Sequence, residues 1–173
     1  MMPKEFISPS KLFNDSFLLA RKIHDSGYRP DILLVLWRGG APVGLVVHEF
    51  LSYKGIKVNQ IVVKAESYSG IGNRRRLRIE SFSAGLSKIK KETRVLVVDD
   101  IFDSGETAKG IEERLSRKTK NIRIATLYLR QGCKTGPDYY VRKVSTWVVF
   151  PHEIRDLSKS EIRKKSRFIS SLL

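Results

Sequence analysis

One segment, residues 94–111 (RVLVVDDIFDSGETAKGI), constrains the fold of this chain more than any other. Its residues 95–98 are an unbroken aliphatic run, which indicates a strand that is covered on both faces of a parallel sheet. Asp99 and Asp100 follow at once, and Asp103 comes three residues later. Because ligands of open α/β sheets bind at the carboxyl ends of the strands, we expect these acids to lie at a ligand-binding edge.

The residues after the acids predict an anion site at the start of a helix. Ala108, Ile111 and Leu115 have the spacing of one apolar helix face. A helix N-terminus favours phosphate, and a glycine lets backbone N–H groups approach it. Acids beside such a loop suit a ligand with sugar hydroxyls and a phosphate, with Mg²⁺ offsetting the negative charge. An isolated Asp-Asp pair, by contrast, is also common in simple turns. The predicted phosphate-binding residues are Ser104, Gly105, Glu106 and Thr107.

The whole segment resembles the phosphoribosyl-pyrophosphate (PRPP) signature of the type I phosphoribosyltransferases. That signature has four apolar residues, two acids, two apolar residues and then Asp-Ser-Gly-x-Thr, and only Phe102 departs from it, where a smaller aliphatic residue is usual. The resemblance implies that Asp99 and Asp100 hold the ribose hydroxyls, directly or through Mg²⁺, and that residues 104–107 hold the 5-phosphate. It also implies that Asp103 contributes to PRPP binding and is the general base for the incoming purine.

A second segment predicts a pyrophosphate loop. Residues 32–36 are another continuous apolar run, and Arg38, Gly39 and Gly40 follow before a helical pattern begins. A guanidinium makes forked contacts to phosphate, although an ordinary Gly-Gly turn would also fit. The segment resembles the Arg-Gly-Gly loop of the xanthine-guanine and hypoxanthine phosphoribosyltransferases, which implies that Arg38 and Gly39 bind pyrophosphate.

Residues 64–82 predict a mobile loop that could close over a polyanion. Gly70 and Gly72 supply flexible points. Ser67 and Tyr68 resemble the Ser-Tyr pair in the flexible loop of the purine-salvage members, where it closes over pyrophosphate. The arginines that follow could belong to a lid or to a nucleic-acid contact, although a charge run is usually only a solvated face. They are Arg74, Arg75, Arg76 and Arg78.

The C-terminal third predicts a hood for the base. Trp147 could stack on a purine whose edge the backbone of Val148 reads, although a tryptophan beside Val-Val-Phe is more often part of a core. The segment resembles the Trp-x-x-x-Pro-Trp-Asp or Glu hood of bacterial and archaeal 6-oxopurine enzymes, which implies that Glu153 lies near Mg²⁺. Arg130 matches the lysine that donates to the exocyclic oxygen in that family, and Lys134 is the alternative donor. Adenine would place its 6-amino group, a hydrogen-bond donor, against this donor and leave both without an acceptor. The pattern therefore argues against adenine as the substrate.

The length of 173 residues suits one α/β domain of the type I phosphoribosyltransferase fold, with a central, mostly parallel sheet flanked by helices. We expect a core over residues 30–130, a small C-terminal hood over 131–155 and a basic amphipathic helix over 156–173 for docking or oligomer contact. The single cysteine, Cys133, excludes an intramolecular disulfide. With no long apolar span and no signal sequence, we expect a cytoplasmic protein without membrane contact.

The net charge of +15, from 33 Lys and Arg against 18 Asp and Glu, favours polyanionic partners. PRPP and pyrophosphate explain part of it, and nonspecific RNA or DNA binding could explain the rest. Two functions follow. The first is Mg²⁺-dependent transfer of ribose 5-phosphate from PRPP to hypoxanthine, guanine or xanthine in purine salvage, by a homo-oligomer as the resemblance implies. The second is a PRPP-sensing regulatory protein of the same fold that binds nucleic acid.

Overall fold

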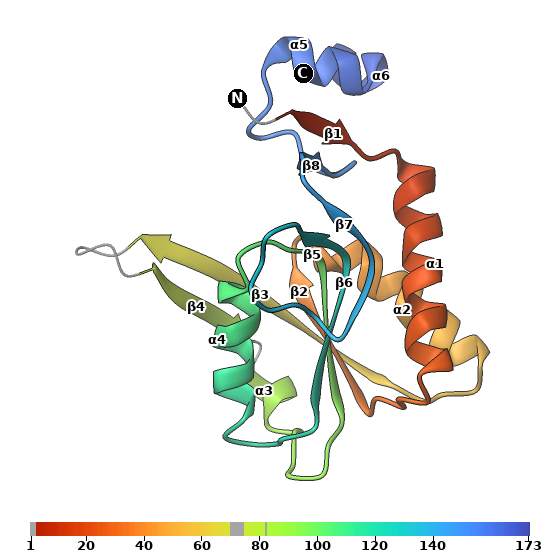
Figure 1. Ribbon diagram of the computed structural model, residues 1–173, viewed down its shortest axis with the longest axis vertical. Helices are drawn as coiled ribbons and strands as arrows, with labels where there is room; N and C mark the ends of the chain where they lie inside the picture. Colours follow the sequence, from red (N-terminus) through yellow and green to blue (C-terminus); the bar gives the residue numbers. More distant parts are fainter. Residues whose placement is uncertain (1–2, 70–74, 82) are drawn as a thin grey trace. The chain divides into compact units, whose positions relative to one another are not determined.

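The computed structural model describes residues 3–69, 75–81 and 83–173, and for residues 65–69, 75–81, 83 and 84 it describes the backbone alone. The chain forms two compact units. One comprises residues 13–145, and the other combines the N-terminal residues through Leu12 with residues 146–173. Figure 1 shows the elements of both, and each unit is described by itself.

A six-stranded sheet forms the centre of the larger unit, in the order β4-β3-β2-β5-β6-β7. Every neighbouring pair is parallel except β3 and β4, which are antiparallel. The prediction of a mostly parallel α/β fold is therefore confirmed. The strands are β2 (Ile32–Trp37), β3 (Asn59–Ser69), β4 (Arg75–Ser81), β5 (Val95–Phe102), β6 (Ile122–Arg130) and β7 (Tyr139–Val144).

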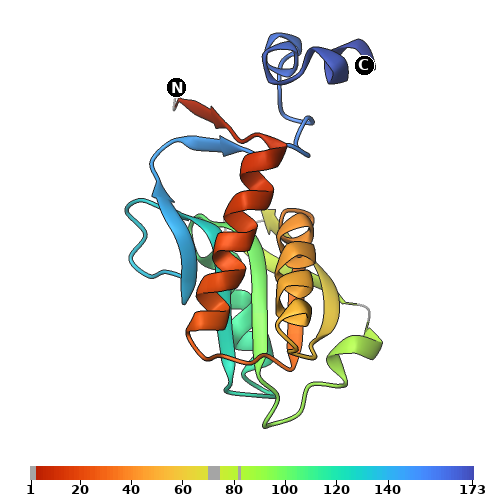
Figure 2. The same cartoon turned by 90° about the vertical axis from the view of Figure 1, so that its right-hand side faces the viewer.

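Helices cover both faces of this sheet. Figure 2 shows α1 (Pro9–Asp25) and α2 (Gly40–Tyr53) on one face and α4 (Glu106–Leu115) behind the sheet, with the short α3 (Ser83–Leu86) near its edge. Successive strand residues point to opposite faces. Leu34 and Val97 therefore share a buried cluster with Ile111 of α4, whereas Val35 faces Gly44 of α2. Both apolar runs are buried on both sides, as their continuous hydrophobicity predicts.

Two segments of this unit differ from the sequence prediction. Residues 64–82 were expected to form a loop, but β3 continues to Ser69 and pairs with β4, from Val63 opposite Ser81 to Ser69 opposite Arg75. Backbone pairing thus organises most of the segment as a hairpin; Gly70, Gly72 and Arg74 lie outside the described residues. Strand β7, expected in the hood, instead extends the central sheet by pairing with β6.

The smaller unit contains a two-stranded parallel sheet, β1 (Lys4–Phe6) with β8 (Trp147–Val149). The N-terminal strand therefore adds to the hood, which the sequence prediction placed in residues 131–155 alone. The expected C-terminal helix is two helices, α5 (Lys159–Lys165) and α6 (Arg167–Ser171), because the extended Ser166 ends the first and its hydroxyl accepts from the Ile169 N–H to begin the second. Glu161 joins α5 to β1 through an ion pair with Lys4 at 2.6 Å.

Within the part of the chain that the structure describes, every helix is too short or too polar to cross a lipid bilayer.

Candidate active site

The carboxyl ends of β2, β5 and β6 meet at one edge of the sheet, because these strands are parallel neighbours. This edge brings together three predicted segments: the Arg38 loop after β2, the acidic loop after β5, and Arg130 at the end of β6. Strand β5 runs on through Phe102, so Asp99 and Asp100 lie within it and point to opposite faces of the sheet. The two adjacent acids therefore face different parts of the structure: Asp99 faces the pocket beside α4, and Asp100 faces the loop at Gly39.

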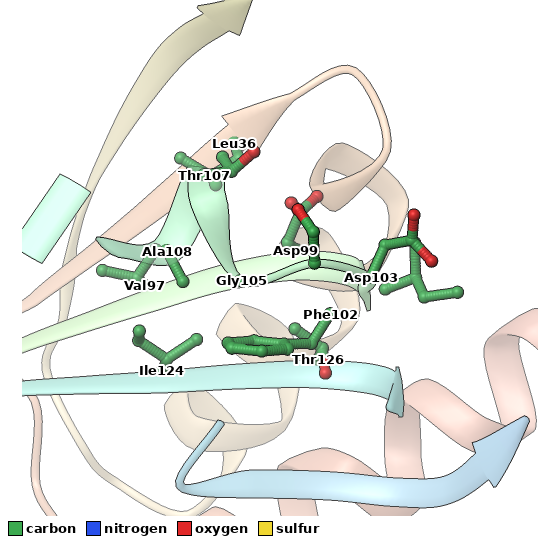
Figure 3. Close-up of a pocket in the computed structure, with 12 residues that line it drawn as sticks. Leu36, Val97, Asp99, Phe102, Asp103, Gly105, Thr107, Ala108, Ile124 and Thr126 are labelled. Carbon is green, nitrogen blue, oxygen red and sulfur yellow. The ribbon is translucent and has the colours of Figure 1, made fainter. Parts of the chain in front are cut away.

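Asp99 lies on the α4 side, in a pocket that Figure 3 shows between β5, β6 and the start of α4. One carboxylate oxygen of Asp99, Oδ1, accepts the backbone N–H of Asp100 at 2.9 Å. Burial raises the pKa of Asp99 to about 6, and the hydrogen bonds from Asp100 lower it by less. A carboxylate held in this way is poised for a cation or for hydroxyl donors. The pocket also includes Val97, Ile101, Phe102, Asp103, Ser104, Gly105, Thr107, Ala108, Ile124 and Thr126.

Replacing Asp99 by Asn is expected to stabilise the ligand-free protein. The pKa of Asp99 is raised on folding from 3.8 to about 6, so the ionised group opposes folding above pH 6, and this penalty disappears as the pH falls below 4. Urea unfolding should show a gain of about 3 kcal/mol at pH 8 that falls well below about 1 kcal/mol near pH 4. An equal gain at both pH values would contradict this cause. Glu113→Gln, on the exposed face of α4, is the matched control.

The predicted phosphate loop, residues 104–107, follows β5 and leads into α4. Gly105 precedes α4 with φ of 79°, in the left-handed region, and the Ser104 hydroxyl accepts the Glu106 N–H at 3.3 Å. The first N–H groups of α4 have no partner within the helix, and these groups form the usual anion site of a helix N-terminus. Thr107 lines the same pocket. The arrangement of residues 104–107 fits a phosphate held by backbone N–H groups and hydroxyls.

Gly105→Ala is expected to destabilise the protein by about 1–2 kcal/mol through its positive φ alone. An added Cβ would also lie 2.9 Å from Cε1 and Cζ of the Phe102 ring, which is the side chain that departs from the family pattern. Phe102→Leu should therefore recover part of the loss in thermal unfolding experiments. If Gly105→Ala lowers Tm equally with Phe102 or Leu at position 102, the contact with the ring does not matter.

The predicted pyrophosphate loop packs directly against Asp100. A Cβ added to Gly39 would lie 2.1 Å from Asp100 Oδ2, and one added to Gly40 would lie 2.4 Å from the Val98 carbonyl oxygen. Only glycine therefore fits at position 39 while Asp100 stays in place, and only glycine fits at position 40 against the backbone of β5. The Trp37–Arg38 peptide bond is cis, and the Arg38 side chain is exposed at this edge. The sequence prediction gave these glycines a role toward phosphate; the structure adds that Gly39 makes room for the Asp100 carboxylate and Gly40 for the Val98 carbonyl.

Asp103 and Arg130 form an ion pair, with Arg130 Nε donating to Asp103 Oδ1 at 2.6 Å. The Arg130 side chain is 15% exposed and that of Asp103 is 56% exposed, so the carboxylate faces solvent while the guanidinium is mostly covered. Cys133 donates its thiol to the Asp103 carbonyl oxygen and so ties the next loop to this turn. The predicted purine-binding arginine thus orients the predicted general base. Lys134, the alternative donor, is exposed on that same loop.

The backbone of Ser67 and Tyr68 lies in β3, opposite Leu77 and Arg76 of β4. Their side chains, like those of Arg75, Arg76 and Arg78, lie outside the described residues. Strand β3 pairs with β2 up to Lys64 opposite Trp37, beside the start of the Arg38 loop. The pyrophosphate role of Ser67 and Tyr68 stays a prediction.

Two of the predicted base residues, Trp147 and Val148, lie in the smaller unit, as does Glu153. Trp147 is 52% exposed, so it is a surface indole rather than a core side chain. Val148 is buried and pairs with Glu5 of β1, and the Val149 carbonyl accepts the Ile7 N–H at 3.0 Å. Glu153 accepts the backbone N–H of Phe150 through Oε2 at 2.8 Å. Within its own unit Glu153 therefore closes a turn, and its predicted place near Mg²⁺ stays a prediction.

Thr126 is a polar residue of the pocket to which the sequence prediction gave no role. It is 1% exposed, lies opposite Asp99 in the register of β5 and β6, and donates its hydroxyl to the Tyr128 carbonyl at 2.9 Å. The sequence feature that could have revealed Thr126 is its hydroxyl group within an otherwise apolar strand, because a buried hydroxyl needs a hydrogen-bond partner. Across the described ranges, no three His, Cys, Asp or Glu side chains gather into a metal-binding group.

Comparison with known proteins identifies the family. The model of the phosphoribosyl transferase domain matches residues 12–159, most of the chain. The chain belongs to this family. Its phosphoribosyl transferase fold explains why the ends of β2, β5 and β6 carry the polar residues of the site.

The chain is similar to several proteins of this family or fold. It is 39% identical over 64 residues to a xanthine-guanine phosphoribosyltransferase of Gluconobacter oxydans; this match covers 36% of each chain, so it spans about a third of the curated relative. A purine phosphoribosyltransferase structure from Pyrococcus horikoshii has 26% identity and a TM-score of 0.75, covering 91% of this chain and 98% of that one. A hypothetical protein from Neisseria gonorrhoeae with bound ppGpp shares the fold, at 19% identity and a TM-score of 0.75, over 100% of this chain and 99% of that one.

Proposed function

We propose that this protein is a Mg²⁺-dependent purine phosphoribosyltransferase that transfers ribose 5-phosphate from PRPP to a 6-oxopurine and releases pyrophosphate, in purine salvage. One observation carries the proposal: a single sheet edge combines adjacent acids, a helix N-terminus for phosphate, the Arg38 loop and the Asp103–Arg130 pair. The named relatives, a xanthine-guanine and a purine phosphoribosyltransferase, point to the same substrates.

The residues around PRPP have complementary roles. The N–H groups at the start of α4, with Ser104 and Thr107, hold the 5-phosphate. Asp99 and Asp100 hold the ribose hydroxyls, and their negative charge stabilises the positive charge that develops on the ribose ring in the transition state. Arg38 and the backbone at Gly39 bind the departing pyrophosphate, and Ser67 and Tyr68 cover it.

The donor set suits Mg²⁺. Magnesium in such sites is held by one or two carboxylates together with oxygens of the substrate, so a cluster of three protein ligands is not required. Asp99, whose pKa burial raises, and the neighbouring Asp100 supply hard oxygen donors of this kind. When bound, the ion would neutralise the negative charge of the diphosphate. The place of Glu153 near Mg²⁺ stays an expectation from the family resemblance.

The purine is held by groups that match a 6-oxo base. The exposed indole of Trp147 offers a stacking face, and the backbone of Val148 reads the edge of the base. Asp103 accepts the proton from N7 of the purine as N9 forms its bond to the ribose. Arg130 donates one N–H to Asp103, and we assign its terminal nitrogens, or Lys134, to the exocyclic oxygen. One arginine thereby links recognition of the oxygen to the position of the base catalyst.

A base panel tests the proposal. The protein is incubated with Mg²⁺ and PRPP and with guanine, hypoxanthine, xanthine, adenine, uracil or orotate, and nucleotide formation is followed directly. Product from one or more 6-oxopurines, and none from adenine, is expected. No product from any base, with PRPP still bound, would contradict the enzyme and favour a PRPP-sensing regulatory protein. Dependence of the rate on added MgCl₂ tests the metal, and sedimentation tests the expected homo-oligomer.

A further inference from the structure

Two loops at the opposite edge of the central sheet concentrate positive charge that the proposed reaction does not use. Residues 87–94 precede β5 and residues 116–121 precede β6, so both lie at the amino ends of neighbouring parallel strands. Both views show them together below the sheet (Figures 1 and 2). Strands of eight or nine residues separate these loops from the site by roughly 25 Å. We call the two loops the amino-edge surface.

The charge on the amino-edge surface is dense and mostly uncompensated. Its 14 residues include seven Lys and Arg against one acid, Glu92, within a chain whose net charge is +15. Arg94 pairs with Asp31 at 2.7 Å. Among the described residues, the other six cations have no carboxylate within ion-pair distance, and all six side chains are exposed. They are Lys88, Lys90, Lys91, Arg117, Lys118 and Lys120.

Hydrogen bonds hold the two loops together. The Thr119 hydroxyl, in a side chain that is 2% exposed, lies 3.0 Å from the Lys91 carbonyl oxygen and 2.8 Å from that of Thr93. The same hydroxyl accepts the Asn121 N–H at 3.0 Å, and the Asn121 carbonyl accepts the N–H of Val95 at 2.8 Å. The backbones that carry the lysines are therefore fixed side by side. Like charges placed so close repel one another, and a bound polyanion would remove this cost.

The composition of the surface favours nucleic acid over a membrane. Binding to a lipid interface combines basic residues with an exposed apolar face. The aliphatic side chain within residues 87–94, Ile89, is 4% exposed and belongs to the core, and residues 116–121 contain none. Phosphate contacts by lysine and arginine, without apolar insertion, are the mode of sequence-independent nucleic-acid binding.

We propose that the amino-edge surface binds the phosphate backbone of a single nucleic-acid strand, at a place separate from the PRPP site. Neutralisation of about five phosphates gives a slope near −3.5 in a plot of log K against log salt, a loss of about a hundredfold between about 50 and 200 mM. Since the contacts go to phosphate, single-stranded RNA and DNA of mixed sequence should bind with similar affinity.

The test compares two variants of equal charge change by fluorescence anisotropy with labelled single-stranded RNA and DNA. Lys90→Glu/Lys118→Glu/Lys120→Glu should lose at least about a hundredfold in affinity. Lys159→Glu/Arg163→Glu/Lys164→Glu, in the basic helix α5, should bind nearly as well as the wild type. Equal loss in both variants would overturn the assignment, because net charge alone would then explain binding.

Two further measurements separate the alternatives. Saturating PRPP and Mg²⁺ should leave RNA binding unchanged; competition would place the RNA in the PRPP site and overturn the proposal. Anionic vesicles of phosphatidylserine and phosphatidylcholine should bind more weakly than RNA at equal salt, and stronger vesicle binding that the amino-edge variant loses would assign the surface to membranes. Circular dichroism and PRPP binding by both variants confirm that they fold.

Discussion

Asp103→Asn is expected to lower kcat by about a hundredfold to ten-thousandfold and to lower PRPP affinity far less. The asparagine Oδ1 can still accept the N–H from Arg130 Nε that now lies 2.6 Å from the carboxylate, so the geometry persists while the proton acceptor is lost. The measurement is steady-state kinetics with guanine or hypoxanthine, together with calorimetric titration of PRPP.

Two controls make this prediction specific. Glu113→Gln makes the same carboxylate-to-amide change on the exposed face of α4 and should leave kcat unchanged. Arg130→Lys keeps a cation but replaces the planar fork, so it should alter KM for the base as well as kcat. If Asp103→Asn turns over at the wild-type rate, Asp103 is not the general base.

Gly39→Ala is expected to lower kcat/KM by about a hundredfold or more, because the new methyl group forces the Asp100 carboxylate out of place. The Cβ would lie 2.1 Å from Asp100 Oδ2 and 2.3 Å from Cγ, well inside van der Waals contact. Asp100 is assigned to the ribose hydroxyls, so PRPP affinity should fall together with turnover. Kinetics with varied PRPP and calorimetry measure the two effects.

A double-mutant cycle separates this displacement from general damage. In an Asp100→Ala background the space is vacated, so adding Gly39→Ala should cost little more. Gly136→Ala is the matched glycine control, since its Cβ would make an ordinary 3.4 Å contact with Leu129 and its φ is not positive. Additive losses in the cycle would show that Gly39 acts independently of Asp100.

The sequence predicted the elements that carry strong local signals. The aliphatic runs of β2 and β5 are buried on both faces, and Ala108, Ile111 and Leu115 form the buried side of α4. Each follows from hydrophobic periodicity, which depends on neighbouring residues alone. The loop after β5 was predictable for the same reason, since its acids and glycine are contiguous in the chain.

The contacts that the sequence did not reveal depend on residues that are distant in the chain. Phe102, the last residue of β5, lies opposite Leu129 of β6. The residue that follows each of them, Asp103 and Arg130, is therefore placed next to the other. Strand β1 has three residues and finds its partner β8 more than 140 positions away. The packing of Gly39 against Asp100 requires the order of strands, which no local pattern contains. The pairing of β3 with β4 was not predicted, because the glycines and arginines of this segment are typical of a loop.

The most direct test of the proposed function follows both products of one reaction. Wild-type protein and the Asp99→Asn variant are each mixed with Mg²⁺, PRPP and an equimolar mixture of guanine, hypoxanthine and xanthine, and nucleotide and pyrophosphate are quantified together. We expect a 6-oxopurine nucleotide and pyrophosphate to appear in equal amounts with the wild type and to be nearly absent with Asp99→Asn. If the wild-type protein binds PRPP but forms neither product, or if pyrophosphate appears without nucleotide, the protein is not a purine phosphoribosyltransferase.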